Sequence, residues 1–216
     1  MTRPTSTRRA PVSQTGKGSA PGEVRIIGGQ WKRSKLSVPA KPGLRPTPDR
    51  VRETLFNWLG QDLSGLRCID AFAGSGALGF EAASRGAAEV RLLELDAQLV
   101  ASLRAHAQRL KADTLRVQAG DALAALRSAG AAAWDVVFLD PPFGDGQNEA
   151  LFQQALQIAA PLLKADGQLY LEAPRAWSDA ELAPFGLHLV RQGKAGQVHY
   201  HLLAPGLALS GDNSAP

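Results

Sequence analysis

From Arg67 onward, short apolar runs alternate with longer segments whose apolar residues recur at helical spacing. The runs predict strands near residues 67–71, 89–94, 114–118, 135–140, 167–172, 187–192 and 197–203. The longer segments predict helices near residues 77–85, 97–111, 121–129 and 148–163, with a weaker one near 178–183. Strands that alternate with helices are typical of an α/β fold with a doubly wound, mainly parallel sheet covered by helices on both faces. Since only Gly193–Gly196 separates the last two strands, we expect them to form an antiparallel hairpin at the sheet edge.

Before this alternation begins, the pattern predicts a β-hairpin. Residues 24–27 form a strand-like run, Gly28-Gly29 is a turn signal, and residues 31–38 resume with polar and apolar positions mixed. The second arm interleaves cations with apolar anchors. It can therefore rest on the body of the protein while presenting charge to phosphates.

A short helix is expected after a proline-rich stretch that suits neither helix nor central strand. Thr47 is a good N-cap and Pro48 fits the first helical position, so the helix should run from Asp49 to about Leu59. One helical face is apolar and consists of Val51, Leu55, Trp58 and Leu59. Arg50 and Arg52 are expected to lie off this face, as cations on a rigid ledge.

Composition places the chain among ordinary globular proteins. Of its 216 residues, 44% are hydrophobic and 20% charged, and no apolar run approaches the roughly 18 residues of a membrane span. The basic N-terminus lacks the apolar region of a secretory signal. The single cysteine, Cys68, fits a reducing compartment, and we expect a cytoplasmic protein.

Charge is distributed unevenly. Residues 1–60 hold 12 Lys and Arg against 3 Asp and Glu, whereas the rest of the chain is mildly acidic. A basic segment of this kind favours a polyanionic partner such as RNA, although a hairpin with ordinary surface lysines remains the alternative. The candidate RNA-binding residues are Arg25, Lys32, Arg33, Lys35, Arg45, Arg50 and Arg52.

Four segments follow from these patterns. Residues 1–22, rich in Pro, Ser, Thr and Gly, are expected to be a disordered basic tail. Residues 23–60 would form the RNA-binding hairpin and helix, and residues 61–204 a Rossmann-like domain. The small and polar residues 205–216 are expected to be a flexible tail.

A glycine loop, Asp70-Ala-Phe-Ala-Gly-Ser-Gly-Ala-Leu-Gly79, links the first predicted strand of the sheet to a helix. Its glycines let a nucleotide approach the backbone, and Glu94, at the end of the next strand, suits ribose hydroxyls. Asp70 would repel a dinucleotide pyrophosphate but suits the α-ammonium of S-adenosylmethionine. We therefore expect S-adenosylmethionine, with a dinucleotide or a purely structural turn as alternatives.

Further cofactor contacts are expected after the third strand of the sheet. The Asp121 carboxylate can reach the adenine amino group and the Ala122 amide a ring nitrogen, although Asp121 is also a good N-cap. Asp96 is expected to cap the following helix rather than bind the cofactor. The candidate cofactor-binding residues are Asp70, Phe72, Gly74, Gly76, Glu94, Asp121 and Ala122.

Asp140-Pro141-Pro142-Phe143 directly follows another apolar strand. In a doubly wound sheet this turn lies at the edge where ligands bind, beside the glycine loop. Its prolines make a stiff turn that presents only acceptors. Asp140 and the Pro141 carbonyl can accept hydrogen bonds from an exocyclic amine of a nucleobase and aim its lone pair at a methyl donor, while Phe143 stacks on the base. No histidine has metal-ligand spacing, and we expect no metal.

With these residues in view, the sequence resembles the RsmD family of bacterial methyltransferases, which modify a guanine N2 amine in small-subunit ribosomal RNA. The resemblance runs from Arg25 to about Leu203. The motifs that carry it are Arg25-Ile-Ile-Gly-Gly-Gln-Trp31, Gly43-Leu-Arg-Pro-Thr47, Asp49-Arg-Val-Arg-Glu-Thr-Leu-Phe-Asn-Trp58, the glycine loop and Asp140–Phe143. It implies the class I S-adenosylmethionine-dependent fold and a monomeric enzyme that acts on 16S ribosomal RNA in the small subunit or its assembly intermediate.

Two other functions stay open at this point. An adenine-N6 methyltransferase acting on DNA or RNA would use the same Asp-Pro-Pro-Phe chemistry, because that turn suits any exocyclic amine. A non-catalytic RNA-binding assembly factor with a vestigial pocket is the other alternative. Asp70, Glu94, Asp121 and Asp140 are all present, which favours a working enzyme.

Overall fold

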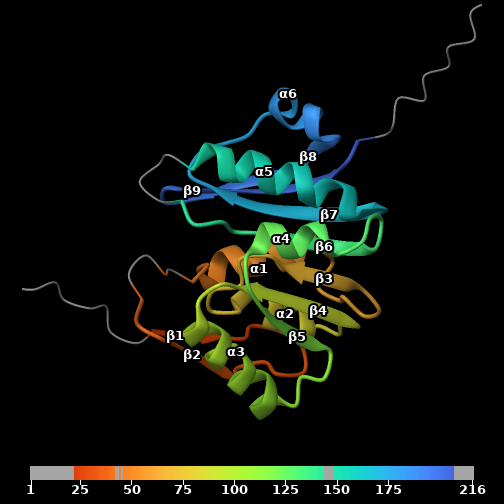
Figure 1. Ribbon diagram of the computed structural model, residues 1–216. Helices are drawn as coiled ribbons and strands as arrows, with labels where there is room; N and C mark the ends of the chain where they lie inside the picture. Colours follow the sequence, from red (N-terminus) through yellow and green to blue (C-terminus); the bar gives the residue numbers. More distant parts are fainter. Residues whose placement is uncertain (1–21, 42–43, 45, 144–147, 207–216) are drawn as a thin grey trace, which may run out of the picture.

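A seven-stranded sheet forms the centre of the molecule in the computed structural model, which describes residues 22–41, 44, 46–143 and 148–206 (Figure 1). The strand order is β5-β4-β3-β6-β7-β9-β8. Strands β5, β4, β3, β6 and β7 are parallel, and β9 is antiparallel to both β7 and β8. The bounds are β3 (Arg67–Asp70), β4 (Glu89–Glu94), β5 (Leu115–Ala119), β6 (Trp134–Leu139), β7 (Leu163–Ala173), β8 (Leu187–Ala195) and β9 (Val198–Pro205). The expected doubly wound sheet with an antiparallel hairpin at one edge is confirmed.

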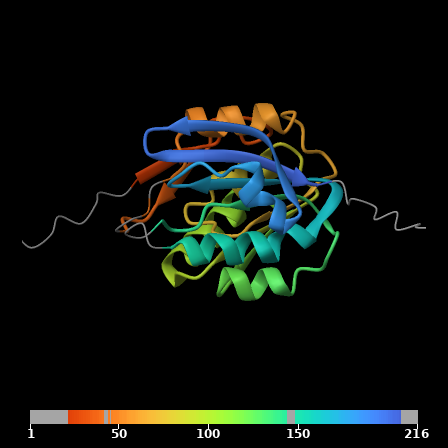
Figure 2. The ribbon, with the colours of Figure 1, turned by 90° about the horizontal axis from the view of Figure 1, so that it is seen from above.

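Helices cover both faces of this sheet. Helices α1, α2 and α3 pack on one face, while α4 and α5 pack on the other. Figure 2 shows α1 on the opposite side of the sheet from α4 and α5. Their bounds are α1 (Asp49–Trp58), α2 (Ala77–Ser84), α3 (Ala97–Leu110), α4 (Ala122–Arg127), α5 (Glu149–Ala159) and α6 (Asp179–Leu182). Two 3-10 turns, η1 (Ala160–Leu162) and η2 (Ala183–Phe185), follow α5 and α6. None of the helices in the described part is long and apolar enough to cross a membrane.

One boundary differs clearly from the sequence-based expectation. The helix predicted for residues 148–163 ends at Ala159, and β7 begins at Leu163, four residues before its predicted start. Pro161 lacks an amide hydrogen and lies in the 3-10 turn, so the α-helical ladder cannot continue. Leu163 pairs with Trp134, and a register shift then restores regular pairing at Gln168. Pairing with β6 therefore extends β7 by the four residues 163–166.

The N-terminal hairpin consists of β1 (Gly22–Arg25) and β2 (Lys35–Val38). β1 begins two residues earlier than expected, and β2 is shorter than expected. The predicted second arm began at Trp31, but that part of the chain forms a wide turn. Two of its amides bind α2: Gln30 N–H donates to the Ser84 carbonyl (2.7 Å) and Trp31 N–H to Ser84 Oγ (3.0 Å). The hairpin is therefore held against the body by its turn, beside α3 (Figure 1).

A buried ion cluster joins this hairpin to α1 and α2. Glu81, fully buried on α2, accepts hydrogen bonds from the amides of Ile27 and Gly28 (2.8 Å each). Its carboxylate also pairs with Arg52 (3.5 Å) and Arg85 (2.8 Å). A charge removed from water requires such partners, because its desolvation costs several kcal/mol. Glu81 thereby fixes three segments that are distant in sequence.

The structure corrects the expectation for Arg52. Its side chain is 0% exposed, and besides Glu81 it binds Asp49 (2.6 Å) and the backbone carbonyls of Arg25 (2.9 Å) and Thr47 (3.2 Å). All of its donors point inward, so it is unavailable to a phosphate. Arg52 is part of the structural junction and not of an RNA-binding surface.

Gly29 should be sensitive to substitution, because the turn lies very close to α2. Its φ is +72°, and a Cβ there would lie 1.8 Å from the Ser84 carbonyl oxygen. We expect Gly29→Ala to lower the free energy of unfolding by at least about 3 kcal/mol, from left-handed strain plus steric overlap. Gly65→Ala is the matched control: its φ is +80° with nothing within 4 Å, so about 1–2 kcal/mol is expected from strain alone. Urea unfolding measures both, and equal losses would contradict the overlap.

The N-terminal segment shares its core with the sheet. Val24, Leu36 and Leu55 belong to the same buried cluster as Cys68 and Phe80. At the other end, β9 extends through Pro205, one residue into the segment expected to be a tail. Most of the two expected tails, residues 1–21 and 207–216, lies outside the described residues.

Candidate active site

Three carboxylates lie at the ends of three neighbouring strands. Asp70 ends β3, Asp140 directly follows β6, and Glu172 lies near the end of β7. In the parallel register Leu139 is opposite Leu171, so Asp140 and Glu172 occupy adjacent positions one residue later. Side chains alternate along a strand, which places all three on the sheet face covered by α1 and α2. Strand order reverses between β3 and β6, the position where doubly wound sheets bind ligands.

The glycine loop between β3 and α2 has the tight backbone that its sequence predicts. Gly74 and Gly76 have φ values of +51° and +78°. A Cβ on Gly76 would lie 2.6 Å from Leu103 Cδ2, so a larger residue would displace α3 packing. Glu94, at the end of β4, accepts from the Gly74 amide and from the Asp96 amide, each at 2.8 Å. The Glu94 carboxylate therefore lies against the loop.

Asp70 is only 2% exposed and accepts one hydrogen bond, from the Gly79 amide at 2.9 Å. Burial raises the pKa of its carboxyl from 3.8 to about 7, and the negative charges of Glu94 and Glu172 add to this increase. The Gly79 amide opposes the shift in pKa, because it stabilises the ionised form. A ligand with a positive charge would stabilise the Asp70 carboxylate further.

Asp140 and Glu172 lie on adjacent strands, and both carboxyl groups have raised pKa values. Burial raises the pKa of Asp140 well above its usual value, and the negative charges of Glu172 and Asp70 raise it further. Burial also raises the pKa of Glu172, although hydrogen bonds from Thr47 and from the Tyr170 hydroxyl (2.9 Å) favour its ionised form. Within the described residues, no Lys or Arg forms an ion pair with Asp70, Asp140 or Glu172. This edge of the sheet therefore has an excess of negative potential.

Sequence reasoning missed Glu172, Tyr170 and the role of Thr47. Thr47 was expected to cap α1, but Pro48 holds the N-cap position and Thr47 is buried against Glu172. The available signal was Glu172 itself, a charged residue between the apolar residues Leu169–Leu171 and Ala173. Glutamate is rarely buried in such a run unless it has a partner or a function. The pairing of Thr47 with it depends on tertiary structure.

The loop that precedes α1 lies over the glycine loop. A Cβ on Gly74 would come within 3.1 Å of Leu44 Cδ1, and Lys41 forms an ion pair with Asp96 at 2.5 Å. Asp96 also caps α3 by accepting from the amides of Gln98 and Leu99, as predicted. The N-terminal segment therefore helps to form one side of the candidate cofactor site. Arg45, in the same loop, lies outside the described residues.

The turn after β6 is braced at both ends. Pro141 is buried, and the Pro142 carbonyl accepts a hydrogen bond from Asn148 at 2.9 Å. Phe143 is half-buried and packs on Phe152 of α5 with ring centroids 6.1 Å apart. Asp140 itself keeps partial access to solvent. The turn presents a partly accessible carboxylate from a rigid backbone.

The other candidate cofactor residues lie nearby along the same edge. Asp121 caps α4 by accepting from the Ala124 amide (2.8 Å), and its side chain remains exposed. Ala122 is buried, and Phe72 is half-buried against the α4–α5 side of the core. Capping and adenine binding use different lone pairs of the Asp121 carboxylate, so the geometry permits both.

The candidate RNA-binding cations lie on the hairpin and α1. Arg25, Lys32, Arg33, Lys35 and Arg50 are exposed, unlike Arg52. Lys35 forms an exposed ion pair with Glu23 at 3.0 Å, which leaves its ammonium accessible. No group of three or more His, Cys, Asp or Glu side chains converges as metal ligands within the described chain.

Comparison with known proteins places this site in context. Residues 24–204 match the family described as Conserved hypothetical protein 95. The chain belongs to this family. It is 42% identical over 186 residues to ribosomal RNA small subunit methyltransferase D of Escherichia coli (strain K12), covering 85% of this chain and 91% of that protein. The Haemophilus influenzae protein of the same name is 40% identical over 191 residues, covering 85% and 95% of the two chains.

Solved structures agree with the sequence relatives. A putative methyltransferase, yhhF, from Escherichia coli superimposes with a TM-score of 0.73 at 41% identity, covering 86% of this chain and 99% of that one. These likenesses confirm the resemblance to the RsmD family and the expected methyltransferase class. The chain accordingly has the methyltransferase fold, and the matches span most of the length of these relatives.

Proposed function

We propose that this protein transfers a methyl group from S-adenosylmethionine to the N2 amine of a guanine in small-subunit ribosomal RNA. One observation carries the proposal: the glycine loop and the Asp140–Phe143 turn meet at the switch point of the sheet, with Asp70 and Asp140 on the same face. A methyl donor and a planar amine held there would face each other. The relatives named as ribosomal RNA methyltransferases support the RNA substrate.

The residues of the cofactor site fit a cationic adenosine cofactor. Asp70 is a buried carboxylate without a basic partner among the described residues, so it suits the α-ammonium group. Glu94 would bind the ribose hydroxyls, while Asp121, Ala122 and Phe72 would contact adenine. When bound, S-adenosylmethionine supplies an electrophilic methyl group on a positively charged sulfur.

The Asp140 turn addresses a specific chemical difficulty. The lone pair of an exocyclic amine is delocalised into the base, which makes the amine a poor nucleophile. Asp140 and the Pro141 carbonyl would accept hydrogen bonds from the NH2 group and direct its lone pair toward the methyl carbon. Phe143 would fix the plane of the base. As the N–C bond forms, the methyl–sulfur bond would break and leave its electron pair on sulfur. The nitrogen is then strongly acidic, and Asp140 would accept its proton.

Exposed cations would hold the substrate. Arg25, Lys32, Arg33, Lys35 and Arg50 supply positive charge on the hairpin and α1, where phosphates can approach. We propose a monomer that acts on the small subunit or its assembly intermediate in the cytoplasm.

Labelled methyl incorporation tests the proposal. Purified protein, methyl-labelled cofactor and small subunits that lack the modification are incubated together, and the RNA is digested to nucleosides for mass analysis. We expect labelled N2-methylguanine at one position. Labelled N6-methyladenine without methylguanine would replace the guanine proposal with the adenine alternative, and RNA binding without any incorporation would favour a non-catalytic assembly factor.

A further inference from the structure

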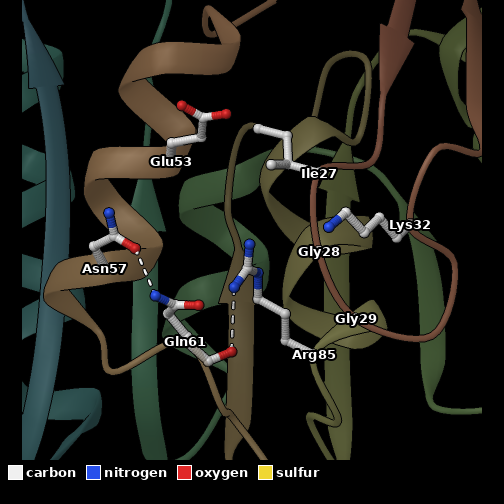
Figure 3. A pocket seen from close by; sticks show the side chains of 8 residues that line it. All are labelled: Ile27, Gly28, Gly29, Lys32, Glu53, Asn57, Gln61 and Arg85. Atoms are coloured by element: carbon white, nitrogen blue, oxygen red, sulfur yellow. Dashed lines mark hydrogen bonds between the residues drawn. The ribbon is translucent and has the colours of Figure 1, made fainter.

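A cavity lies between the hairpin turn and α1, and its lining does not include Asp70, Asp140 or Glu172. This cleft has a volume of about 440 Å³ (Figure 3). Lys32 lines it from the turn, and Glu53 and Asn57 line it from α1. Gln61, in the segment between α1 and β3, and Arg85, which follows α2, complete the lining. The Lys32 ammonium and the Glu53 carboxylate point into the gap from opposite sides. The lining therefore offers a cation on one wall and hydrogen-bonding groups on the other.

The walls of the cleft are rigid. The turn is held by the Glu81 hydrogen bonds to the Ile27 and Gly28 amides. Arg85 pairs with Glu81 and also donates to the Gln61 carbonyl at 3.3 Å. A cleft with fixed walls needs little ordering when a ligand binds, and this favours affinity.

The backbone at Gln61 is an independent observation. Gln61 has a φ of +64°, a conformation in which glycine would be relaxed. Its side chain donates to Asn57 Oδ1 at 2.9 Å, which places two amide groups side by side at the wall of the cleft. Arg33, next to Lys32, also has a left-handed φ, of +72°. Non-glycine residues in such conformations cluster at functional sites, where the side chain is needed despite the strain.

The chemistry of the lining matches a nucleic acid strand. An ammonium group binds phosphate, while amide and carboxylate side chains bind the edges of unpaired bases. Helix α1 links the cleft to the active edge, since Thr47 contacts Glu172 and Asn57 lies ten residues further. At about 1.5 Å per residue, the stretch from Asp49, at the start of α1, to Asn57 spans roughly 12 Å along the helix. One RNA strand can reach both.

We propose that this cleft binds a single-stranded segment of the RNA substrate next to the target nucleotide. Lys32 would hold a phosphate, and Asn57, Gln61 and Glu53 would contact a base edge. This inference rests on the proposed function, because it assumes that the substrate is RNA.

Two variants of the full-length protein test the cleft. Lys32→Ala should weaken binding to substrate RNA about 3–10-fold and lower the salt slope of log Kd by about 1. Gln61→Gly should weaken binding by about 3–10-fold while the thermal midpoint stays equal or rises, because glycine relieves the strain. Lys111→Gly is the matched control: Lys111 has a φ of +51° at the end of α3, and this variant should keep full RNA affinity.

The readouts are Kd for fluorescent ribosomal RNA, KM and kcat for small subunits, and the thermal midpoint. We expect a higher KM with little change in kcat for both cleft variants. Unchanged Kd and KM in both cleft variants would overturn the proposal that the cleft binds RNA, even if the wild-type protein methylates guanine. Inactivity of the wild-type protein on RNA would instead refute the proposed function. Loss of affinity for small subunits without loss for protein-free RNA would assign the cleft to a ribosomal protein and also overturn the inference.

Discussion

Replacement of Asp140 by Ala is expected to reduce methyl transfer by about 10³-fold while cofactor affinity changes less than about threefold. Asp140 is the one acidic side chain among the described residues of the turn after β6, and in the proposed function it orients the amine rather than binding the cofactor. Loss of a single oriented group at a reacting centre costs about 10²–10³ in rate. Single-turnover methylation of small subunits at saturating cofactor measures the rate, and calorimetry measures cofactor binding.

Two controls accompany this variant. Asp140→Asn keeps a carbonyl acceptor and should retain part of the activity. Asp166→Ala removes an exposed carboxylate near the other end of β7 and should leave the rate unchanged. Wild-type turnover by Asp140→Ala would disprove the amine-orienting role and leave the Pro141 carbonyl as the acceptor that matters.

The second large effect concerns Asp70 and pH. With a pKa of about 7, Asp70 is mostly protonated below neutrality in the free protein. Only the ionised form attracts an ammonium group, so the cofactor affinity of the wild-type protein should fall by nearly tenfold per pH unit below about pH 7. Asp70→Asn should bind the cofactor at least about 30-fold more weakly at pH 7.5 and show a nearly flat profile. Calorimetric titration from about pH 5.5 to 7.5 checks both.

The same substitution should stabilise the unliganded protein. The folded-state pKa of Asp70 lies above its ordinary value of 3.8, so the native state holds more protons between about pH 4 and pH 7. The stability contributed by the protonated group is therefore lost as pH rises through that window, by up to about 4 kcal/mol. Asp70→Asn stays neutral and can still accept from the Gly79 amide, so it should unfold at a higher temperature than wild type at pH 8. A lower midpoint would contradict the buried-charge explanation.

The two predictions depend on the same arrangement of charge. Asp70, Asp140 and Glu172 carry pKa values raised by burial at one sheet edge, and no basic side chain of the described chain pairs with them. Hydrophobic packing on the sheet face covered by α1, α2 and α3 offsets the free-energy cost of burying these carboxylates. Sites that are destabilising without a ligand in this way are typical of binding and catalysis.

The sequence by itself determined the parallel sheet, the antiparallel terminal hairpin and the two motifs at Asp70–Gly79 and Asp140–Phe143. These depend on local periodicity and on turn chemistry, which a short stretch of chain contains in full. It also placed both motifs at one edge, because parallel strands share their carboxyl end.

Only the tertiary structure decided that Glu172 joins Asp140, that Thr47 binds Glu172 instead of capping α1, and that Arg52 is buried. Each of these depends on which distant segments pack together: Glu81 reaches the hairpin turn across more than fifty residues of chain. Whether a charged side chain faces water or a buried partner depends on the neighbours that folding brings to it. Neither the spacing of hydrophobic residues nor the number of charges in the sequence identifies those neighbours.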